Sequence, residues 1–140
     1  MNDQRAIEIL ARTIWGEARS EGVEGMKAIT CVVLNRVSIA QKRGGHFWWG
    51  HDIQSVCLKP WQFSCWNKND PNRQKVLAVT SDDPHFFHAL KIAKEAITCG
   101  LEDMTLGSDH YHTVYIHPFW SKEEDPQCQI GRHLFYKLIE

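Results

Sequence analysis

The chain contains 140 residues with a formal net charge of −1. This length is typical of one domain, and the charge excludes the large basic excess of a dedicated nucleic-acid binder. Hydrophobic residues make up 43% of the sequence and charged residues 24%, which excludes a disordered or collagen-like chain. We therefore expect one folded domain over residues 1–140 and no nucleic-acid partner.

The sequence contains no segment that resembles a membrane span or an export signal. The longest strongly apolar run covers residues 28–34, far short of the roughly 20 residues that a span requires. The N-terminus, MNDQR, leads directly into a polar-patterned helix without a signal-peptide core. We expect the chain to start in the cytoplasm, where its five cysteines, which include no CxxC pair, would be reduced and mostly buried thiols.

Two helices are predicted in the first third of the chain. An apolar stripe at helical spacing predicts the first, from Asn2 or Asp3 to about residue 18. Glu17 lies at its end, roughly 80° from the middle of the stripe, which places it at the edge of the buried face. The second, over about residues 25–37 after a polar connection, is apolar nearly all round and is expected to be buried. Asn35 and Arg36 are expected to tie it to the loop that follows.

The middle of the chain, residues 38–80, is predicted to be mostly irregular, with a short helix at 53–58 and an aromatic segment at 61–66. A third long helix begins at Pro84, capped by Asp83, and ends at Gly100. Alternating and β-branched residues predict strands at about 109–116 and 134–139, with a turn at Gly131. Helices followed by a small hairpin indicate an α+β fold.

Glu17 is the first candidate for chemistry. A carboxyl group at a helix end, beside tryptophan and apolar neighbours, lies where desolvation raises a pKa. Such a glutamic acid can donate a proton near neutral pH as a general acid. The alternative is an ordinary exposed helix glutamate. Glu21 and Glu24 lie in the connection that follows and are weaker candidates.

Histidines and a cysteine offer other chemistries. Two histidines of the first predicted strand, His110 and His112, point to one face and could share a zinc ion with His117 or His133. No HExxH or CxxC motif accompanies them. The alternatives are that these histidines line a cleft as hydrogen-bond donors, or that they lie in the core with hydrogen bonds to the backbone. Cys65 could act as a nucleophile, but a buried structural thiol is the favoured interpretation.

Aromatic residues gather in the Gly- and Pro-rich loops. We expect at least two or three of them to line a groove, because aromatic faces stack on the apolar faces of sugars. The set is Trp48, Trp49, Trp61, Phe63, Trp66, Tyr111 and Trp120.

Four blocks, in order, resemble the spore-cortex-lytic type of cell wall hydrolase, the SleB/CwlJ-like family. They are ARTIWGEAR at residues 11–19, with its GEA signature; GMKAI through VLNRV at 25–37; QFSCW at 62–66; and HYH, PFW and IGRHLFY at 110–112, 118–120 and 130–136. The resemblance covers nearly the whole chain.

The resemblance implies a lysozyme-like α+β fold, mainly helical with a small antiparallel sheet near the C-terminus. It implies that Glu17 is the catalytic acid and that the substrate is the glycan strand of peptidoglycan, cut between N-acetylmuramic acid and N-acetylglucosamine. Family members of the lytic transglycosylase type use one glutamate, whereas the usual glycosidase needs two carboxylates. Asp109 is the only other carboxylate worth watching, and a muramidase route stays open.

Substrate contacts are assigned to the third and fourth blocks. Gln62 and Ser64 are expected to hydrogen-bond sugar or acetamido groups, Phe63 and Tyr111 to shape the groove, and His110 and His112 to lie in the same cleft. Arg132 and His133 are expected to fix the last strand. We assign no metal, no cofactor and a monomeric state.

Two departures from the family matter. Spore members carry export signals and a wall-binding domain, whereas this chain resembles a phage endolysin that stays in the cytoplasm until release. The turn before His110 reads Gly107-Ser108-Asp109, where phage-type relatives have Gly-Ala-Thr. The alternative functions are a zinc-dependent wall amidase or peptidase and a non-catalytic peptidoglycan-binding protein.

Overall fold

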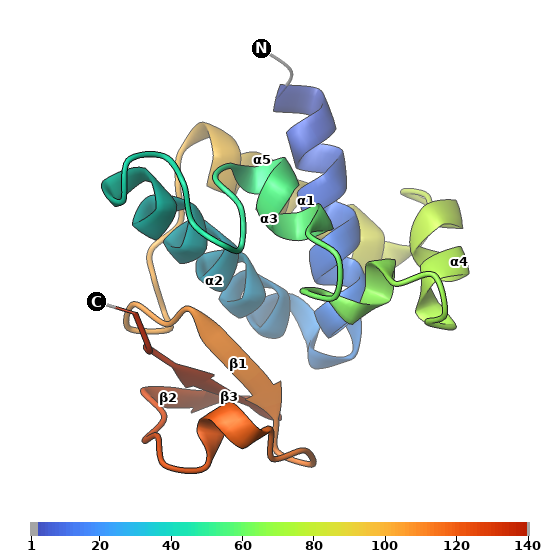
Figure 1. The fold of residues 1–140 in the computed structure, drawn as a ribbon. Coiled ribbons are helices and arrows are strands. Elements are labelled where there is room, and N and C mark those ends of the chain that lie inside the picture. The colour runs from blue at the N-terminus through green and yellow to red at the C-terminus, as the bar shows by residue number, and fades with distance from the viewer. Residues whose placement is uncertain (1–2, 140) are drawn as a thin grey trace.

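A computed structural model describes residues 3–139, in which helices pack beside a small antiparallel sheet (Figure 1). The helices are α1 (Asp3–Ala18), α2 (Gly22–Lys42), α3 (Ile53–Leu58), α4 (Asn72–Ala78) and α5 (Pro84–Thr98), and the strands are β1 (His110–Thr113), β2 (Cys128–Ile130) and β3 (His133–Tyr136). Single 3-10 turns lie at Arg19–Glu21, Ser64–Trp66 and Phe119–Ser121. The predicted α+β fold, mainly helical with its sheet near the C-terminus, is confirmed.

Helix α1 is the centre of the helical layer and contacts α2, α3, α4 and α5 (Figure 1). Its predicted stripe is buried, including Leu10, Ile14 and Ala18, so the first helix was predicted correctly. Asn2, the alternative start, lies outside the described residues. Burial of this stripe supplies hydrophobic stabilisation and fixes the direction in which the last turn of α1 presents Glu17.

Helix α2 is longer than predicted at both ends. Gly22, with φ of +77°, follows the 3-10 turn at Arg19–Glu21, and the helix begins there rather than at residue 25. This sharp reversal requires a left-handed backbone that glycine adopts without strain. The helix continues past residue 37 to Lys42, because Ala40 is buried and anchors the last turn. Its predicted burial is confirmed at Ala28 and Val32, which have no exposed surface.

The stretch at 38–80 is more ordered than predicted. The short helix α3 is confirmed, and Asp52 and Ser55 cap its start reciprocally. Helix α4 was not predicted, because within its seven residues only Val76 is buried and no periodic stripe develops. Helix α5 begins as predicted, with the Asp83 carboxylate accepting the backbone N–H of Phe86 at 3.0 Å.

The sheet has three strands in the order β1-β3-β2, rather than the two of the predicted hairpin. The missed strand, β2, has only three residues and pairs with β3 across the turn at Gly131, whose φ is +57°. Strand β1 stops at Thr113 and β3 at Tyr136, so both are shorter than predicted. In the β1–β3 register Tyr111 lies opposite Phe135.

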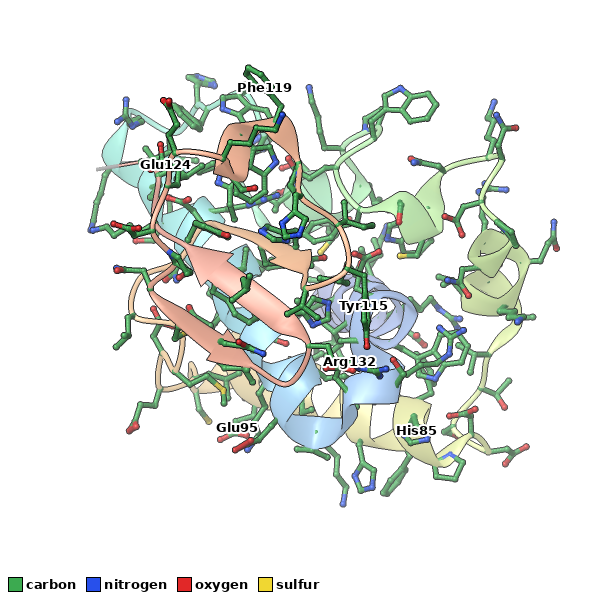
Figure 2. All side chains as sticks on the ribbon, turned by 90° about the horizontal axis from the view of Figure 1, so that it is seen from below. His85, Glu95, Tyr115, Phe119, Glu124 and Arg132 are labelled. Carbon is green, nitrogen blue, oxygen red and sulfur yellow. The ribbon has the colours of Figure 1, made fainter. Side chains whose placement is uncertain are left out.

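An ion pair attaches the sheet to the junction of α1 and α2. The Glu21 carboxylate accepts the backbone N–H of Arg132 at 2.6 Å and its Nε at 2.7 Å. Tyr115 lies beside Arg132 near this junction (Figure 2). A Cβ atom at Gly131 would collide with the Glu21 carboxylate, so glycine is required there for space as well as for its φ angle. Arg132 thus fixes the turn before the last strand, while Glu21 is its structural partner.

Two further features of residues 3–139 concern membrane-spanning helices and the state of the cysteines. None of their helices has the length and apolar character needed to cross a bilayer. All five cysteines are free thiols, of which Cys31, Cys57 and Cys65 are buried, Cys128 is half-buried and Cys99 is exposed.

Candidate active site

Glu17 lies on the wall of a cleft of about 430 Å³ between the helical layer and the sheet. The other residues that line it are Arg36, Trp48, Lys59, Pro60, Trp61, Gln62, Ser64, His110, Tyr111 and Trp120. Among these described residues Glu17 is the only carboxylic acid. Within residues 3–139 the cleft therefore has one residue able to act as a carboxylic acid catalyst.

A close approach between α1 and the QFSCW segment builds one side of the site. A Cβ atom at Gly16 would lie 2.8 Å from Cβ and Sγ of Cys65 and from Cγ2 of Val76, so only glycine allows this contact. The Trp66 indole Nε1 donates to Thr13 Oγ1 at 2.9 Å and fixes the segment on α1. As a result, the backbone N–H of Cys65 reaches Glu17 Oε2 at 3.3 Å.

Strand β1 supplies the second contact of the carboxyl group. The Tyr111 hydroxyl donates to Glu17 Oε1 at 2.5 Å. The Tyr111 ring lies against Phe63 and Phe135, with ring centroids 6.5 and 5.9 Å away. Tyr111 is therefore held by packing on the side away from the cleft, and both oxygens of Glu17 are positioned by groups from different parts of the chain.

Burial raises the pKa of Glu17 above its ordinary value, because desolvation disfavours the carboxylate. The hydrogen bonds from Tyr111 and Cys65 stabilise the carboxylate and lower the pKa, but they do not outweigh burial. A glutamic acid with a raised pKa keeps its proton closer to neutral pH and can donate it to a leaving group.

Replacing Tyr111 with Phe is expected to shift the pH dependence of activity. The acid must be protonated, so kcat/KM should fall as pH rises through the pKa of Glu17. Tyr111→Phe removes a hydrogen bond that lowers this pKa, and the alkaline limb should therefore move to higher pH. We also expect kcat to drop about ten- to hundredfold, because the carboxyl group loses a positioning contact.

The measurement is the pH profile of kcat/KM on solubilised glycan strands, with Tyr115→Phe as the matched control at an exposed tyrosine. The control profile should overlay that of the wild type. An alkaline limb that stays in place or moves to lower pH in Tyr111→Phe would contradict this assignment of the hydrogen bond.

Gln62 and Ser64 both line the cleft, as expected for residues that contact substrate. The Gln62 amide Nε2 donates to the backbone carbonyl oxygens of Val56 at 2.7 Å and Trp49 at 3.2 Å. Its Oε1 is buried without a hydrogen-bond partner among residues 3–139. Gln62 thus anchors the segment to the preceding loop, while the exposed Ser64 side chain is free to meet a ligand.

His112, expected in the cleft, and Phe63, expected to shape the groove, are both absent from the cleft lining. Phe63 is 1% exposed and packs behind Tyr111, so it shapes the groove only indirectly. The His112 ring is buried, with Nε2 2.8 Å from the Tyr136 hydroxyl and Nδ1 2.7 Å from the Thr113 carbonyl. His112 was misassigned because strand spacing shows a shared face but not how deeply each residue is covered.

His110 lines the cleft and is oriented by Asp109. Its Nδ1 lies 2.8 Å from Asp109 Oδ1. Asp109 has no exposed surface, and its carboxylate also accepts the backbone N–H groups of Leu138 and Ile139 at 3.0 Å each. Burial alone would raise the pKa of Asp109, but these hydrogen bonds, with that from His110, outweigh it and lower the pKa. Asp109 is a structural anchor of the C-terminal segment and lies outside the cleft lining.

Arg36 lines the cleft, although its sequence position predicted only that it ties α2 to the following loop. The Arg36 side chain instead extends toward β1, where its Nε donates to the Asp109 backbone carbonyl oxygen at 2.8 Å. The backbone carbonyl oxygen of Arg36 does contact the loop after α2, because it accepts a hydrogen bond from Trp49 Nε1 at 2.9 Å. Arg36 Nη1 is buried without a hydrogen-bond partner in the described chain. The sequence signal for this role is weak, because α2 also carries the cations Lys27 and Lys42.

The alternative chemistries find little support in the geometry. Among residues 3–139 no group of three or more His, Cys, Asp or Glu side chains is arranged to hold a metal ion. Burial, reinforced by Glu17, raises the pKa of the Cys65 thiol, which disfavours the nucleophilic thiolate.

The aromatic set divides between the core and the cleft. Trp49 is fully buried, while Trp66 packs against the core. Trp48, Trp61, Tyr111 and Trp120 line the cleft, and the first two are 58% and 78% exposed. The predicted aromatic groove is thus built from four of its seven candidates.

A half-buried glutamic acid in an open cleft with aromatic walls defines a class of site found in glycan-cleaving enzymes. The comparisons with known proteins agree with this class. A family model described as cell wall hydrolase matches residues 20–136, and the chain belongs to this family of enzymes. The matched region begins three residues after Glu17. A search among curated proteins found no significant match.

Two solved structures share the fold. The catalytic domain of the germination-specific lytic transglycosylase SleB from Bacillus anthracis has a TM-score of 0.71 and 24% identity, covering 96% of this chain and 95% of that one. The catalytic domain of Bacillus cereus SleB has a TM-score of 0.67 and 22% identity, covering 96% and 91%. These matches confirm the lysozyme-like fold expected from the resemblance.

Proposed function

We propose that the protein cleaves peptidoglycan glycan strands as a lytic transglycosylase, with Glu17 as its single catalytic carboxyl group. The observation that carries this proposal is that, among residues 3–139, Glu17 alone supplies a carboxyl group to the cleft and that burial raises its pKa. The similar Bacillus anthracis domain is described as a lytic transglycosylase, which supports the reaction type.

The proposed reaction uses Glu17 twice. Protonated Glu17 donates its proton to the glycosidic oxygen as the bond from C1 of N-acetylmuramic acid to O4 of N-acetylglucosamine breaks. The substrate's own N-acetyl group stabilises the cationic C1. The Glu17 carboxylate then takes the proton from the muramic 6-hydroxyl as O6 attacks C1, which closes a 1,6-anhydro ring and restores the acid. No water is consumed, and no second enzyme carboxylate is needed, unlike in the usual glycosidase.

The neighbouring residues support this scheme in distinct ways. The hydrogen bonds from Tyr111 and Cys65 hold the carboxyl group in one orientation between the two proton transfers. Ser64 and His110 are proposed to hydrogen-bond sugar or acetamido groups, since both line the cleft. Gln62 is proposed to bind through its Oε1 after a small movement, because that atom has no hydrogen-bond partner in the described part of the chain.

The type of bond that is cut tests the proposal against an amidase or peptidase. Purified peptidoglycan should release soluble disaccharide peptides without new free amino groups, with or without EDTA. New amino groups, or release that EDTA abolishes, would overturn the proposal and return attention to the histidines. A folded protein that binds peptidoglycan and releases nothing would be the non-catalytic binder.

A monomeric state, storage in the cytoplasm before release to the wall, and a phage origin remain predictions. Light scattering of the purified protein measures the oligomeric state, and fractionation of the producing cells shows where the protein is stored.

A further inference from the structure

A second pocket, of about 390 Å³, adjoins the cleft that contains Glu17. It is lined by Leu58, Pro60, Trp61, Trp66, Asn67, Lys68, Asn69 and Arg73. Pro60 and Trp61 line both pockets, so the two are separated only by this short segment. A ligand that fills the cleft can therefore extend into the second pocket past Trp61.

Trp61 has an unusual conformation at the boundary. Its φ is +69°, a left-handed value that is costly for a bulky residue and is retained at functional sites. Its backbone N–H donates to Asn67 Oδ1 at 3.3 Å, and its side chain stays 78% exposed. Core packing gives no reason for this strain, since the indole is largely in solvent. The strained conformation is explained if Trp61 forms a wall against which an extended ligand lies.

The second pocket is cationic. Lys68 and Arg73 line it, and no acidic side chain does so among the described residues. Arg73 Nε is buried and has no hydrogen-bond partner within residues 3–139, so no described acceptor is bound to the guanidinium at that atom. Asp70, the nearest acid in sequence, accepts the backbone N–H of Asn72 at 2.8 Å. The pocket thus offers two positive charges and the Asn67 and Asn69 amides to an anion.

We infer that this pocket binds a carboxylate of the peptide stem carried by the glycan, and that it makes the enzyme favour stem-bearing over stem-free strands. The inference rests on the proposed function, which places the glycan in the adjoining cleft. Where a muramic acid of the bound strand bears a peptide stem, that peptide carries free carboxylates, so an anion attached to the strand lies near the cleft. Guanidinium and ammonium groups form charge-assisted hydrogen bonds with carboxylates.

The test compares soluble, uncross-linked glycan strands with and without stems. Both come from peptidoglycan freed of phosphate polymers, and one is stripped of stems by an amidase. We expect wild type to have the higher kcat/KM on the stem-bearing strands. In Lys68→Gln/Arg73→Gln the ratio of kcat/KM between the two substrates should fall about tenfold. Lys68→Arg/Arg73→Lys, which keeps both charges, should retain most of it.

The matched control is Lys75→Gln/Lys94→Gln, which removes two charges from exposed positions outside both pockets. Its ratio should stay within about twofold of wild type. An unchanged ratio in the pocket variant, or an equal fall in the control, would overturn the inference.

If Arg73 is necessary for folding, the single variant Lys68→Gln, at an exposed residue, must still lower the ratio of kcat/KM between the two substrates. Cleavage of neither substrate by wild type would instead show that the proposed function is wrong. A fall that appears only when phosphate polymers are left on the wall would identify phosphate as the ligand.

Discussion

Glu17→Gln is expected to abolish glycan cleavage, with kcat on purified peptidoglycan falling at least about a thousandfold. The glutamine fills the same space, and its one amide oxygen can accept the hydrogen bond from either Tyr111 or Cys65, but it has no acidic proton to donate to the leaving oxygen. No other acidic side chain lines the cleft in the described chain, so nothing replaces it. The rate of release of soluble muropeptides measures the effect.

The melting temperature at pH 7 shows whether the Glu17→Gln variant is folded. Because burial raises the pKa of folded Glu17 above the unfolded value, the stability contributed by its protonation is full at low pH and is lost as pH rises through the folded pKa. Glutamine resembles the protonated form, so Glu17→Gln should melt no lower than wild type at pH 7. Glu24→Gln, at an exposed position on α2, is the matched control and should keep full activity. Retained cleavage in a folded Glu17→Gln would show that another group is the acid.

Ala28→Glu is expected to unfold the protein. Ala28 has no exposed surface and belongs to the main hydrophobic cluster around α2. A glutamate there must bury a charge without a partner and overfill the core, at a cost of several kcal/mol. That is comparable to the 5–15 kcal/mol, roughly, that stabilises a typical domain. Thermal and urea unfolding monitored by circular dichroism measure the loss.

Val23→Glu is the control for the introduced charge. Val23 is 40% exposed in the first turn of the same helix, where an acidic residue interacts favourably with the helix dipole. Its melting temperature should stay close to that of wild type. If Ala28→Glu melted at the same temperature as Val23→Glu, the predicted burial of α2 would be wrong.

The elements that the sequence predicted well have a local physical signal. Helices α1 and α5 each bury one apolar stripe, and α5 also carries its Asp83 cap and Pro84 at the first position. Helix α4 and strand β2 lack such a signal, because seven and three residues are too few for a periodic pattern. Their stability comes from contacts with α1 and β3, which only the folded chain supplies.

The candidate site was predictable in its residue types but not in its geometry. The edge position of Glu17 followed from helix geometry, and its role from the resemblance. By contrast, the contact of Gly16 with Cys65 and the hydrogen bond from Tyr111 join residues 49 and 94 positions apart. The cleft position of Arg36 and the burial of His112 also depend on how the sheet packs on α2. Sequence spacing carries no information on such long-range contacts.

Whether one glutamate cuts the glycan without consuming water is decided by the products formed in water enriched in heavy oxygen. Mass spectrometry of the muropeptides released by wild type should show anhydro ends, lighter by one water molecule than hydrolysed ends and free of the heavy isotope. New reducing ends that carry the heavy oxygen, above the level in a sample incubated without enzyme, would contradict this mechanism and identify the enzyme as a hydrolysing muramidase.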